Sequence, residues 1–193
     1  AAFGFPVIQK IDANNRNTQA LILSPTRELC LQITNEIKNY SKYEKGINVV
    51  AVYGGASITE QAREIKRGAQ IIVATPGRMQ DMINRGLVNI TQINYCILDE
   101  ADEMLNMGFR DDIEVILQST PAARQTVFFS ATIPRPIQEL IKKYARDPQS
   151  VRIEQKAVTV PTVEQIYYEV DRRYKIELLT RLIDIHDLKL GII

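Results

Sequence analysis

The sequence predicts an α/β fold in which helices cover both faces of a parallel sheet, so that the domain has three layers. Short apolar runs alternate with segments of helical spacing through most of the chain. The apolar runs are nearly continuous rather than alternating apolar and polar, which is typical of strands that are buried on both faces. With 193 residues, 45 % of them hydrophobic, the chain can also bury a full core.

Five runs have the composition of buried strands: Ala20 to Ser24, Ile47 to Tyr53, Gln70 to Ala74, Tyr95 to Asp99 and Thr126 to Ser130. Between them, apolar residues recur every three or four positions, as they do along one face of a helix. This spacing is seen in Leu29, Ile33 and Ile37, and again in Met79, Met82 and Ile83. Further helices are expected over Ala2 to Ile11, Ile58 to Lys66, Asp111 to Gln118 and Pro136 to Tyr144. This order of elements predicts a doubly wound sheet.

The sequence is expected to divide into three parts: a partial first domain over residues 1–153, a linker over 154–162 and the start of a second domain over 163–193. The linker is polar and β-branched, and Pro161 prevents a helix from continuing through it. The second domain is expected to begin with a strand over Val163 to Val170, an amphipathic helix over Arg172 to Ile185 and a strand over Leu190 to Ile193. Since both termini fall inside predicted elements, we expect the chain to be part of a longer protein.

Composition excludes several classes of protein. No run of about 18 apolar residues occurs and no basic segment precedes an apolar one at the start, so neither a spanning helix nor a signal peptide is predicted. Cys30 and Cys96 lack the companions of a zinc site and are expected to be reduced. We therefore expect a soluble, cytoplasmic protein with no membrane partner. The net charge of +1 gives no general attraction to a polyanion, so nucleic acid would have to be bound by a local arrangement of groups.

Small, polar or charged residues directly follow each predicted strand. Ligands bind at the carboxyl ends of parallel strands, so these residues are expected to form one site. After the fourth strand, Asp99 and Glu100 have the arrangement of a magnesium-dependent nucleoside triphosphatase. Asp99 can hold a hydrated Mg²⁺ that bridges phosphates, and Glu100 can orient and deprotonate the attacking water. The alternative is an acidic helix start that the helix dipole favours.

Two hydroxyls follow the fifth strand, in Ser130 and Thr132. They can reach Asp102 and thereby transmit the state of a phosphate site. The alternative is that they cap the next helix, because Ser and Thr are preferred at that position and Pro134 lies near a helix start. The sequence leaves this choice open.

The other three strand ends carry no side chain that is suited to acid or base chemistry. They offer hydroxyls, glycines, backbone amides and two arginines, from Pro25, Thr26, Arg27, Gly54, Gly55, Thr75, Pro76, Gly77 and Arg78. Glycines permit close approach, helix starts supply unpaired N–H groups, and an arginine can bind a phosphate through two hydrogen bonds. This inventory suits a sugar-phosphate backbone. The alternative is that the glycines only form turns.

Together, the five clusters resemble the motif set of the DEAD-box RNA helicases, in the same order. The matching segments are Pro25 to Leu29 (PTREL), Gly54-Gly55 (GG), Thr75 to Arg78 (TPGR), Asp99 to Asp102 (DEAD) and Ser130 to Thr132 (SAT). The resemblance implies a RecA-like sheet, ATP and Mg²⁺ as cofactors, and RNA as the partner that is unwound or remodelled. It also implies that Asp102, Ser130 and Thr132 couple hydrolysis to RNA, which the clusters after the first three predicted strands contact. Arg110 is a further candidate for RNA contact.

The sequence departs from the family because it contains no GxxxxGK loop to cradle phosphates. In the family, a strand and that loop precede a helix like Ala1 to Ile11, and the strand lies inside the sheet. The sheet is therefore expected to lack its phosphate-loop strand and to leave two neighbouring strands without partners. We expect the 193-residue chain neither to hydrolyse ATP nor to unwind RNA, whereas the longer protein does both. A DNA-acting translocase and a non-catalytic RNA-binding or scaffold module are the alternatives.

Overall fold

The computed structural model describes residues 1–153, 164, 166–186, 189 and 191. The chain forms two compact units, Ala1–Gln149 and Ser150–Ile193. The predicted linker over residues 154–162 lies outside the described residues. Its role as a linker therefore stays a prediction.

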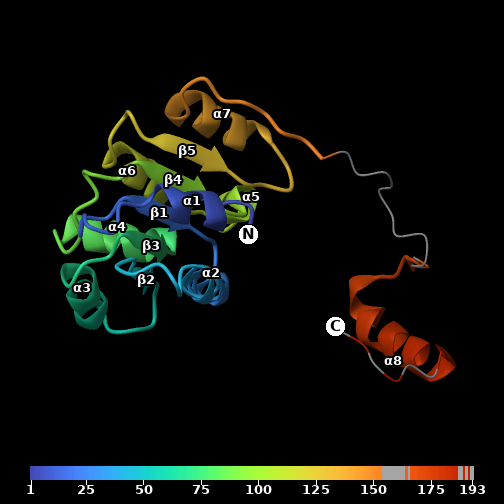
Figure 1. Ribbon diagram of the computed structural model, residues 1–193. Helices are drawn as coiled ribbons and strands as arrows, with labels where there is room; N and C mark the ends of the chain where they lie inside the picture. The colour runs from blue at the N-terminus through green and yellow to red at the C-terminus, as the bar shows by residue number, and fades with distance from the viewer. Residues whose placement is uncertain (154–163, 165, 187–188, 190, 192–193) are drawn as a thin grey trace. The chain divides into compact units, whose positions relative to one another are not determined.

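A five-stranded parallel sheet forms the centre of the first unit, with the strand order β2-β3-β1-β4-β5 (Figure 1). The strands are β1 (Ala20–Leu23), β2 (Val49–Val52), β3 (Ile71–Ala74), β4 (Tyr95–Leu98) and β5 (Gln125–Phe128). All five predicted strands are present. Each is shorter than its predicted run. β1, β2, β4 and β5 stop before the polar or small residues at the run's end, which belong to the following turn, whereas β3 lacks Gln70 at its start and β5 begins one residue early, at Gln125.

Each strand of the sheet is hydrogen-bonded to its neighbours without a gap. β1 pairs with both β3 and β4, while β2 pairs with β3 and β5 with β4. The expectation that a missing inner strand leaves two neighbours unpaired is therefore wrong, because β1, β3 and β4 each have a partner on both sides. A further strand can join this sheet only along β2 or β5.

One face of the sheet packs against α1 (Gly4–Lys10) and α2 (Arg27–Tyr40). Alternate residues of the strands supply this core, including Ile22, Val73 and Ile97. Because side chains alternate between the faces of a strand, the intervening residues form a second core on the other side. The predicted burial on both faces is confirmed.

The opposite face is covered by the helices that follow β2, β3, β4 and β5. They are α3 (Ile58–Lys66), α4 (Pro76–Asn84), α5 (Ala101–Asn106), α6 (Arg110–Gln118) and α7 (Arg135–Tyr144). Leu21, Ile72 and Leu98 lie in this core and are fully buried. The three-layer α/β prediction is thus confirmed.

α5 was not predicted as a helix. Its six residues, with Met104 buried, are too few to show a repeated apolar spacing. It begins directly after Glu100, and its buried residues Ala101 and Met104 anchor this end of the acidic cluster to the second core.

In the second unit, a 3₁₀ turn (Arg172–Tyr174) leads into α8 (Lys175–His186), where the amphipathic helix was expected. The strand predicted over Val163 to Val170 is not found at its described positions, residues 164 and 166–170. A strand is held by hydrogen bonds to a neighbouring strand, and no described residue pairs with this segment. The predicted strand over Leu190 to Ile193 lies outside the described residues, except for Gly191.

Among the helices formed by the described residues, none has the length and apolar character required to cross a membrane.

Candidate functional site

The register of the sheet brings all five polar clusters to one edge. Leu23, the last residue of β1, lies beside Ala74 on one side and Leu98 on the other. The same row continues to Val52 of β2 and to Phe128 of β5. Each cluster begins within two residues of this row, so the prediction of one shared rim is confirmed.

Strand order divides this rim into two sides. The clusters that follow β2, β3 and β1 contain both arginines and the glycines, and they are neighbours. The clusters that follow β4 and β5 contain the carboxylates and hydroxyls. The site therefore has a cationic side and an acidic side within one continuous edge.

On the acidic side lies an open cleft of about 450 Å³, lined by Asp99, Glu100, Asp102, Glu103, Phe129, Ser130 and Ala131. Glu100 caps α5 with a left-handed backbone, φ 50°, and its side chain makes no capping bond. The N–H of Ala101 donates to the carbonyl of Phe129, which ties this turn to the end of β5. Since a left-handed glutamate costs energy and such residues gather at functional sites, the turn points to a role for Glu100 beyond starting a helix.

Asp99 is half-buried, and burial raises the pKa of its carboxyl group, although a hydrogen bond from the N–H of Glu100 acts to lower it. No group of three or more His, Cys, Asp or Glu side chains among the described residues could hold a metal alone. Mg²⁺ commonly binds through one or two carboxylates together with water and substrate phosphates. The Asp99 carboxylate, at the cleft, fits this type of site.

Asp102 and the residues after β5 form a compact hydrogen-bonded clasp. The backbone N–H and the hydroxyl of Thr132 both donate to Oδ2 of Asp102, at 2.9 and 2.7 Å. The N–H of Asp102 donates to Oγ of Ser130, and that hydroxyl donates to the carbonyl of Thr132. α7 is preceded by Pro134 and has no side-chain cap. Of the two possibilities open from the sequence, the structure therefore shows bonding to Asp102.

The clasp makes part of the stability dependent on pH. Burial acts to raise the pKa of Asp102, but the hydrogen bonds that its carboxylate accepts, chiefly from Thr132, outweigh it, so this pKa is lowered. A lowered pKa stabilises the fold above the ordinary value of about 4 and ceases to do so as pH falls through the folded-state pKa.

We therefore expect Thr132→Val to lower the free energy of unfolding by about 0.5 to 1 kcal/mol at pH 7, a range reduced for solvent exposure. The difference from the unmodified chain should shrink as pH falls below about 4, because a neutral Asp102 accepts these bonds less strongly. Urea unfolding of both chains at a series of pH values measures it. A difference that is constant between neutral and acidic pH would contradict this account of the clasp.

On the cationic side, Thr26 caps α2 by accepting a hydrogen bond from the N–H of Leu29. The guanidinium of Arg27 lies over the ring of Tyr53, 4.9 Å from its centroid. Gly55 has φ +80°, and a Cβ built there would lie 3.5 Å from Nη1 of Arg27. This distance is an ordinary contact, so the argument for glycine is its backbone: with φ +80° a side chain at this position would be strained.

Arg78 is anchored from the first turn of α4, where Pro76 occupies one of the first two positions and Thr75 makes no side-chain cap. Its Nη1 donates to the carbonyl of Ala56 at 3.0 Å and to Oε1 of Gln61 at 3.2 Å. Because a guanidinium has five N–H donors, Arg78 keeps donors for a ligand while it is held.

A family model described as DEAD/DEAH box helicase matches residues 1–140. The chain belongs to this family. It is 47 % identical to the ATP-dependent RNA helicase CshA of Listeria monocytogenes, over 100 % of this chain and 37 % of that protein. It is 44 % identical to the DEAD-box ATP-dependent RNA helicase CshA of Geobacillus kaustophilus, over 100 % of this chain and 41 % of that protein.

Solved structures agree with this assignment. A DEAD box protein from the hyperthermophile Methanococcus jannaschii matches 94 % of this chain and 48 % of its own, with a TM-score of 0.77 and 42 % identity. A hypothetical ATP-dependent RNA helicase from Sulfolobus tokodaii matches 77 % of this chain and 43 % of its own, with a TM-score of 0.69 and 35 % identity. The sheet is thus that of a DEAD-box RecA-like domain, and the chain spans less than half the length of these relatives.

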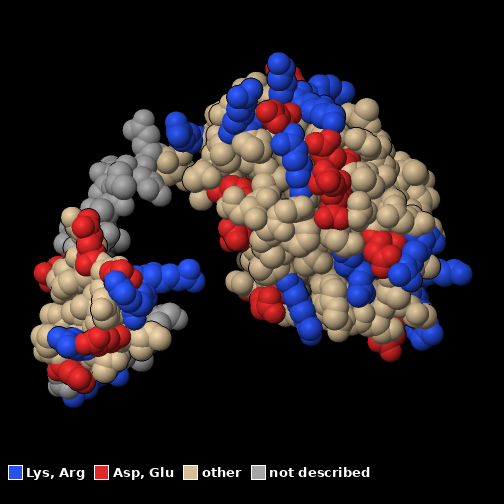
Figure 2. All heavy atoms as spheres, turned by 180° about the vertical axis from the view of Figure 1, so that it is seen from behind, with Lys and Arg blue, Asp and Glu red and all other residues tan. Residues whose placement is uncertain are grey.

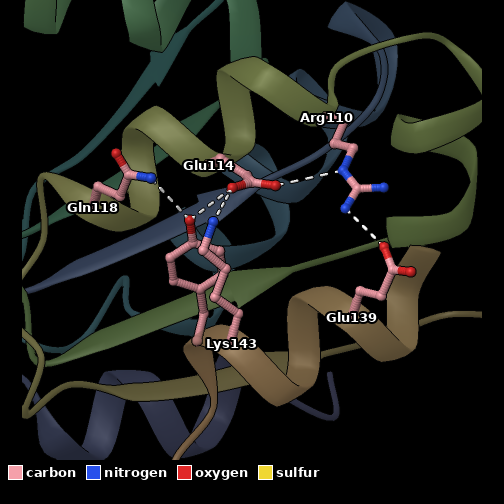
Figure 3. A network of polar contacts seen from close by, with 6 residues as sticks. Arg110, Glu114, Gln118, Glu139 and Lys143 are labelled. Carbon is pink, nitrogen blue, oxygen red and sulfur yellow. Dashed lines mark hydrogen bonds and ion pairs between the residues drawn. The ribbon is translucent and has the colours of Figure 1, made fainter. Parts of the chain in front are cut away.

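Arg110, a further candidate for RNA contact, is already paired with protein in this DEAD/DEAH box chain. Its guanidinium donates to Glu139 at 2.9 Å and to Glu114 at 3.4 Å. Figure 3 shows Glu114 between Arg110 on one side and Lys143 on the other, where it joins α6 to α7. The hydroxyl of Tyr144 also donates to Glu114. Nearby carboxylates therefore offset the charge of Arg110, which makes it a weaker candidate for RNA than Arg27 or Arg78.

Charges of both signs lie next to one another on the face of the first unit that Figure 2 shows. This face has no extended field of one sign, which agrees with the net charge of +1. A polyanion bound on this face would therefore have to rely on local donors.

Two residues of the rim escaped prediction. Tyr53 is the last residue of a predicted strand, and its ring supports Arg27. Gln61 lies in α3 and bonds to Arg78. Neither is part of a motif, and only the fold brings them to the arginines. The burial of Gln61 beside the partly buried Ile58, Ala62 and Ile65 becomes visible only in the structure.

Proposed function

We propose that the protein containing this chain is an ATP-dependent RNA helicase that unwinds short duplexes or remodels RNA–protein complexes. The observation that carries the proposal is the single rim on which acidic and cationic clusters adjoin. ATP hydrolysis would occur on the acidic side, and RNA would lie along the cationic side. Because the chain spans 37 % of the L. monocytogenes relative, the complete activity is assigned to the longer protein.

Asp99 and Glu100 would act on the nucleotide. Mg²⁺, when bound, would neutralise phosphate charge and orient the phosphates. Asp99 would hold it, and its position at the end of a buried strand fixes the carboxylate. Glu100 would orient and deprotonate the attacking water, since its exposed carboxylate lines the cleft.

RNA would be held by its sugar-phosphate chain on the other side of the rim. The starts of α2 and α4 offer N–H groups, Gly54 and Gly55 allow close approach, and two arginines can bind phosphates. The contributing residues would be Pro25, Thr26, Arg27, Gly54, Gly55, Thr75, Pro76, Gly77 and Arg78. Contacts of this kind position a strand without reading its bases.

Asp102, Ser130 and Thr132 would couple hydrolysis to RNA, starting from within the acidic side. Their hydrogen bonds join the helix after the acidic cluster to the loop after β5. A change at the phosphates that moves one segment would move the other.

The test is a hybrid in which this chain replaces the matching stretch of the L. monocytogenes relative. We expect the hybrid to hydrolyse ATP faster with RNA than with DNA of the same sequence, and to separate a short RNA duplex, since 2′-hydroxyl groups distinguish the two nucleic acids. Equal stimulation by DNA would favour a DNA-acting translocase. RNA binding without any hydrolysis would favour a non-catalytic binding or scaffold module.

We further propose that the 193-residue chain alone does not turn over ATP. It contains no GxxxxGK sequence, and an amide cradle with a lysine is the principal anchor for the phosphates. A phosphate-release assay should therefore give the same rate for this chain and for its Glu100→Gln variant. Turnover that depends on Glu100 in the isolated chain would contradict the proposal.

A further inference from the structure

Gln61 occupies an unusual position in α3. It is 6 % exposed and is the only buried residue of this helix. An amide that is buried without partners is unfavourable, so a buried glutamine has to be hydrogen-bonded. Both ends of the Gln61 amide are in fact bonded, and both bonds lead to the cationic side of the rim.

The two bonds connect three separate segments. Nε2 of Gln61 donates to the carbonyl of Tyr53 at 3.1 Å, and Oε1 accepts from Nη1 of Arg78 at 3.2 Å. Tyr53 follows β2, Gln61 lies in α3 and Arg78 lies in α4. One buried side chain therefore fixes the end of one strand and the start of a helix that follows a different strand.

Both arginines of the rim depend on this connection. Arg78 is bonded to Gln61 directly and also donates to the carbonyl of Ala56. Arg27 is held through the ring of Tyr53, whose carbonyl Gln61 fixes. The spacing between the two guanidinium groups is thus set partly by a residue that is itself buried.

We propose that Gln61 is a positioning residue that holds Arg27 and Arg78 at the separation needed to bind two phosphates of one RNA strand. The inference rests on the proposed function, because it concerns the RNA side of the same rim. Loss of the Gln61 amide keeps both arginines in the chain but no longer holds their guanidinium groups at fixed positions. Binding then becomes weaker while the net charge is unchanged.

The test compares two substitutions in the 193-residue chain. Gln61→Met keeps the size of the side chain and removes both bonds, while Gln70→Met is the matched control. Gln70 is 3 % exposed and accepts a hydrogen bond from the N–H of Asn48, near the opposite end of the strands. Gln61→Asn, which keeps an amide too short to reach both partners, is a second variant in case the methionine variant does not fold.

The first readout is binding of a short oligouridine at several salt concentrations. We expect Gln61→Met and Gln61→Asn to bind about fivefold more weakly, and the slope of log affinity against log salt to become shallower by up to about 0.7, as for one lost phosphate contact. Gln70→Met should leave affinity and slope unchanged. The net charge is the same in all four chains, so a difference reports the placement of the arginines.

The second readout is the NMR signal of the Arg78 side chain, assigned by its loss in Arg78→Lys. It should shift in both Gln61 variants without RNA and remain in place in Gln70→Met. If the unmodified chain binds RNA but the Gln61 variants bind equally well, or if the Arg78 signal does not move, the positioning role is wrong and the proposed function stands. If the unmodified chain does not bind RNA at all, the RNA side of the proposed function fails, and this inference fails with it.

Discussion

Replacing Glu100 with Gln is expected to lower RNA-stimulated ATP hydrolysis of the hybrid protein by at least about 100-fold, the usual contribution of a general base. Gln keeps the size of the side chain and its ability to accept a hydrogen bond, but it cannot take a proton from water. The left-handed backbone at Glu100 and its place in the cleft beside Asp99 are the basis for the prediction. Binding of RNA should change by less than about twofold, because the substitution leaves the cationic side of the rim intact.

Glu103→Gln is the matched control for this prediction. Glu103 lines the same cleft and lies three residues further along the chain. The Glu103→Gln substitution removes the same charge from nearly the same place. Any effect that comes only from the electrostatic field in the cleft therefore appears in both variants. Comparable hydrolysis rates for the Glu100 and Glu103 variants would show that Glu100 is not the base.

Replacing Arg27 with Ala is expected to weaken binding of single-stranded RNA by roughly 10- to 100-fold, as for loss of hydrogen bonds to a charged group. The stacking on Tyr53 directs this guanidinium toward one position, and Gly55 leaves room beside it. The salt dependence should also become shallower by about 0.7 in the slope of log affinity against log salt. Fluorescence titration with a labelled oligouridine at several salt concentrations measures both quantities.

Arg85→Ala provides the comparison for Arg27. Arg85 follows α4 at its carboxyl end, away from the rim where that helix begins, and it pairs with Asp81. The substitution changes the net charge equally. If both variants lost the same affinity, RNA binding would depend on total charge and not on the local arrangement.

The strands and most helices could be predicted because local sequence decides them. Runs such as Ile71–Ala74 are apolar throughout, and the residues after them are turn formers or helix starters. The shared rim could be predicted from one rule, because the carboxyl ends of parallel strands lie at the same edge of a sheet. The bonds of Thr132 to Asp102 could be foreseen only as one of two possibilities, because capping and long-range bonding use the same hydroxyl.

Other features depend on distance in space and are not encoded in any short segment. Gln61 and Arg78 are 17 residues apart and meet only when α3 and α4 pack on the same face. The pairing of all five strands without a gap depends on which strands become neighbours, and the apolar runs do not specify the order of the strands. The predicted strand over Val163 to Val170 shows the reverse error at its described positions, since β-branched composition favours a strand, but no described residue pairs with this segment.

The division of the rim into an acidic nucleotide side and a cationic RNA side is tested most directly by backbone amide NMR shifts as oligouridine is added to the 193-residue chain. We predict that the largest shifts fall at the starts of α2 and α4 and at Gly54 and Gly55, with small changes in α6 and α7. Largest shifts at the opposite edge of the sheet, around Asn48 and Gln70, would contradict this division.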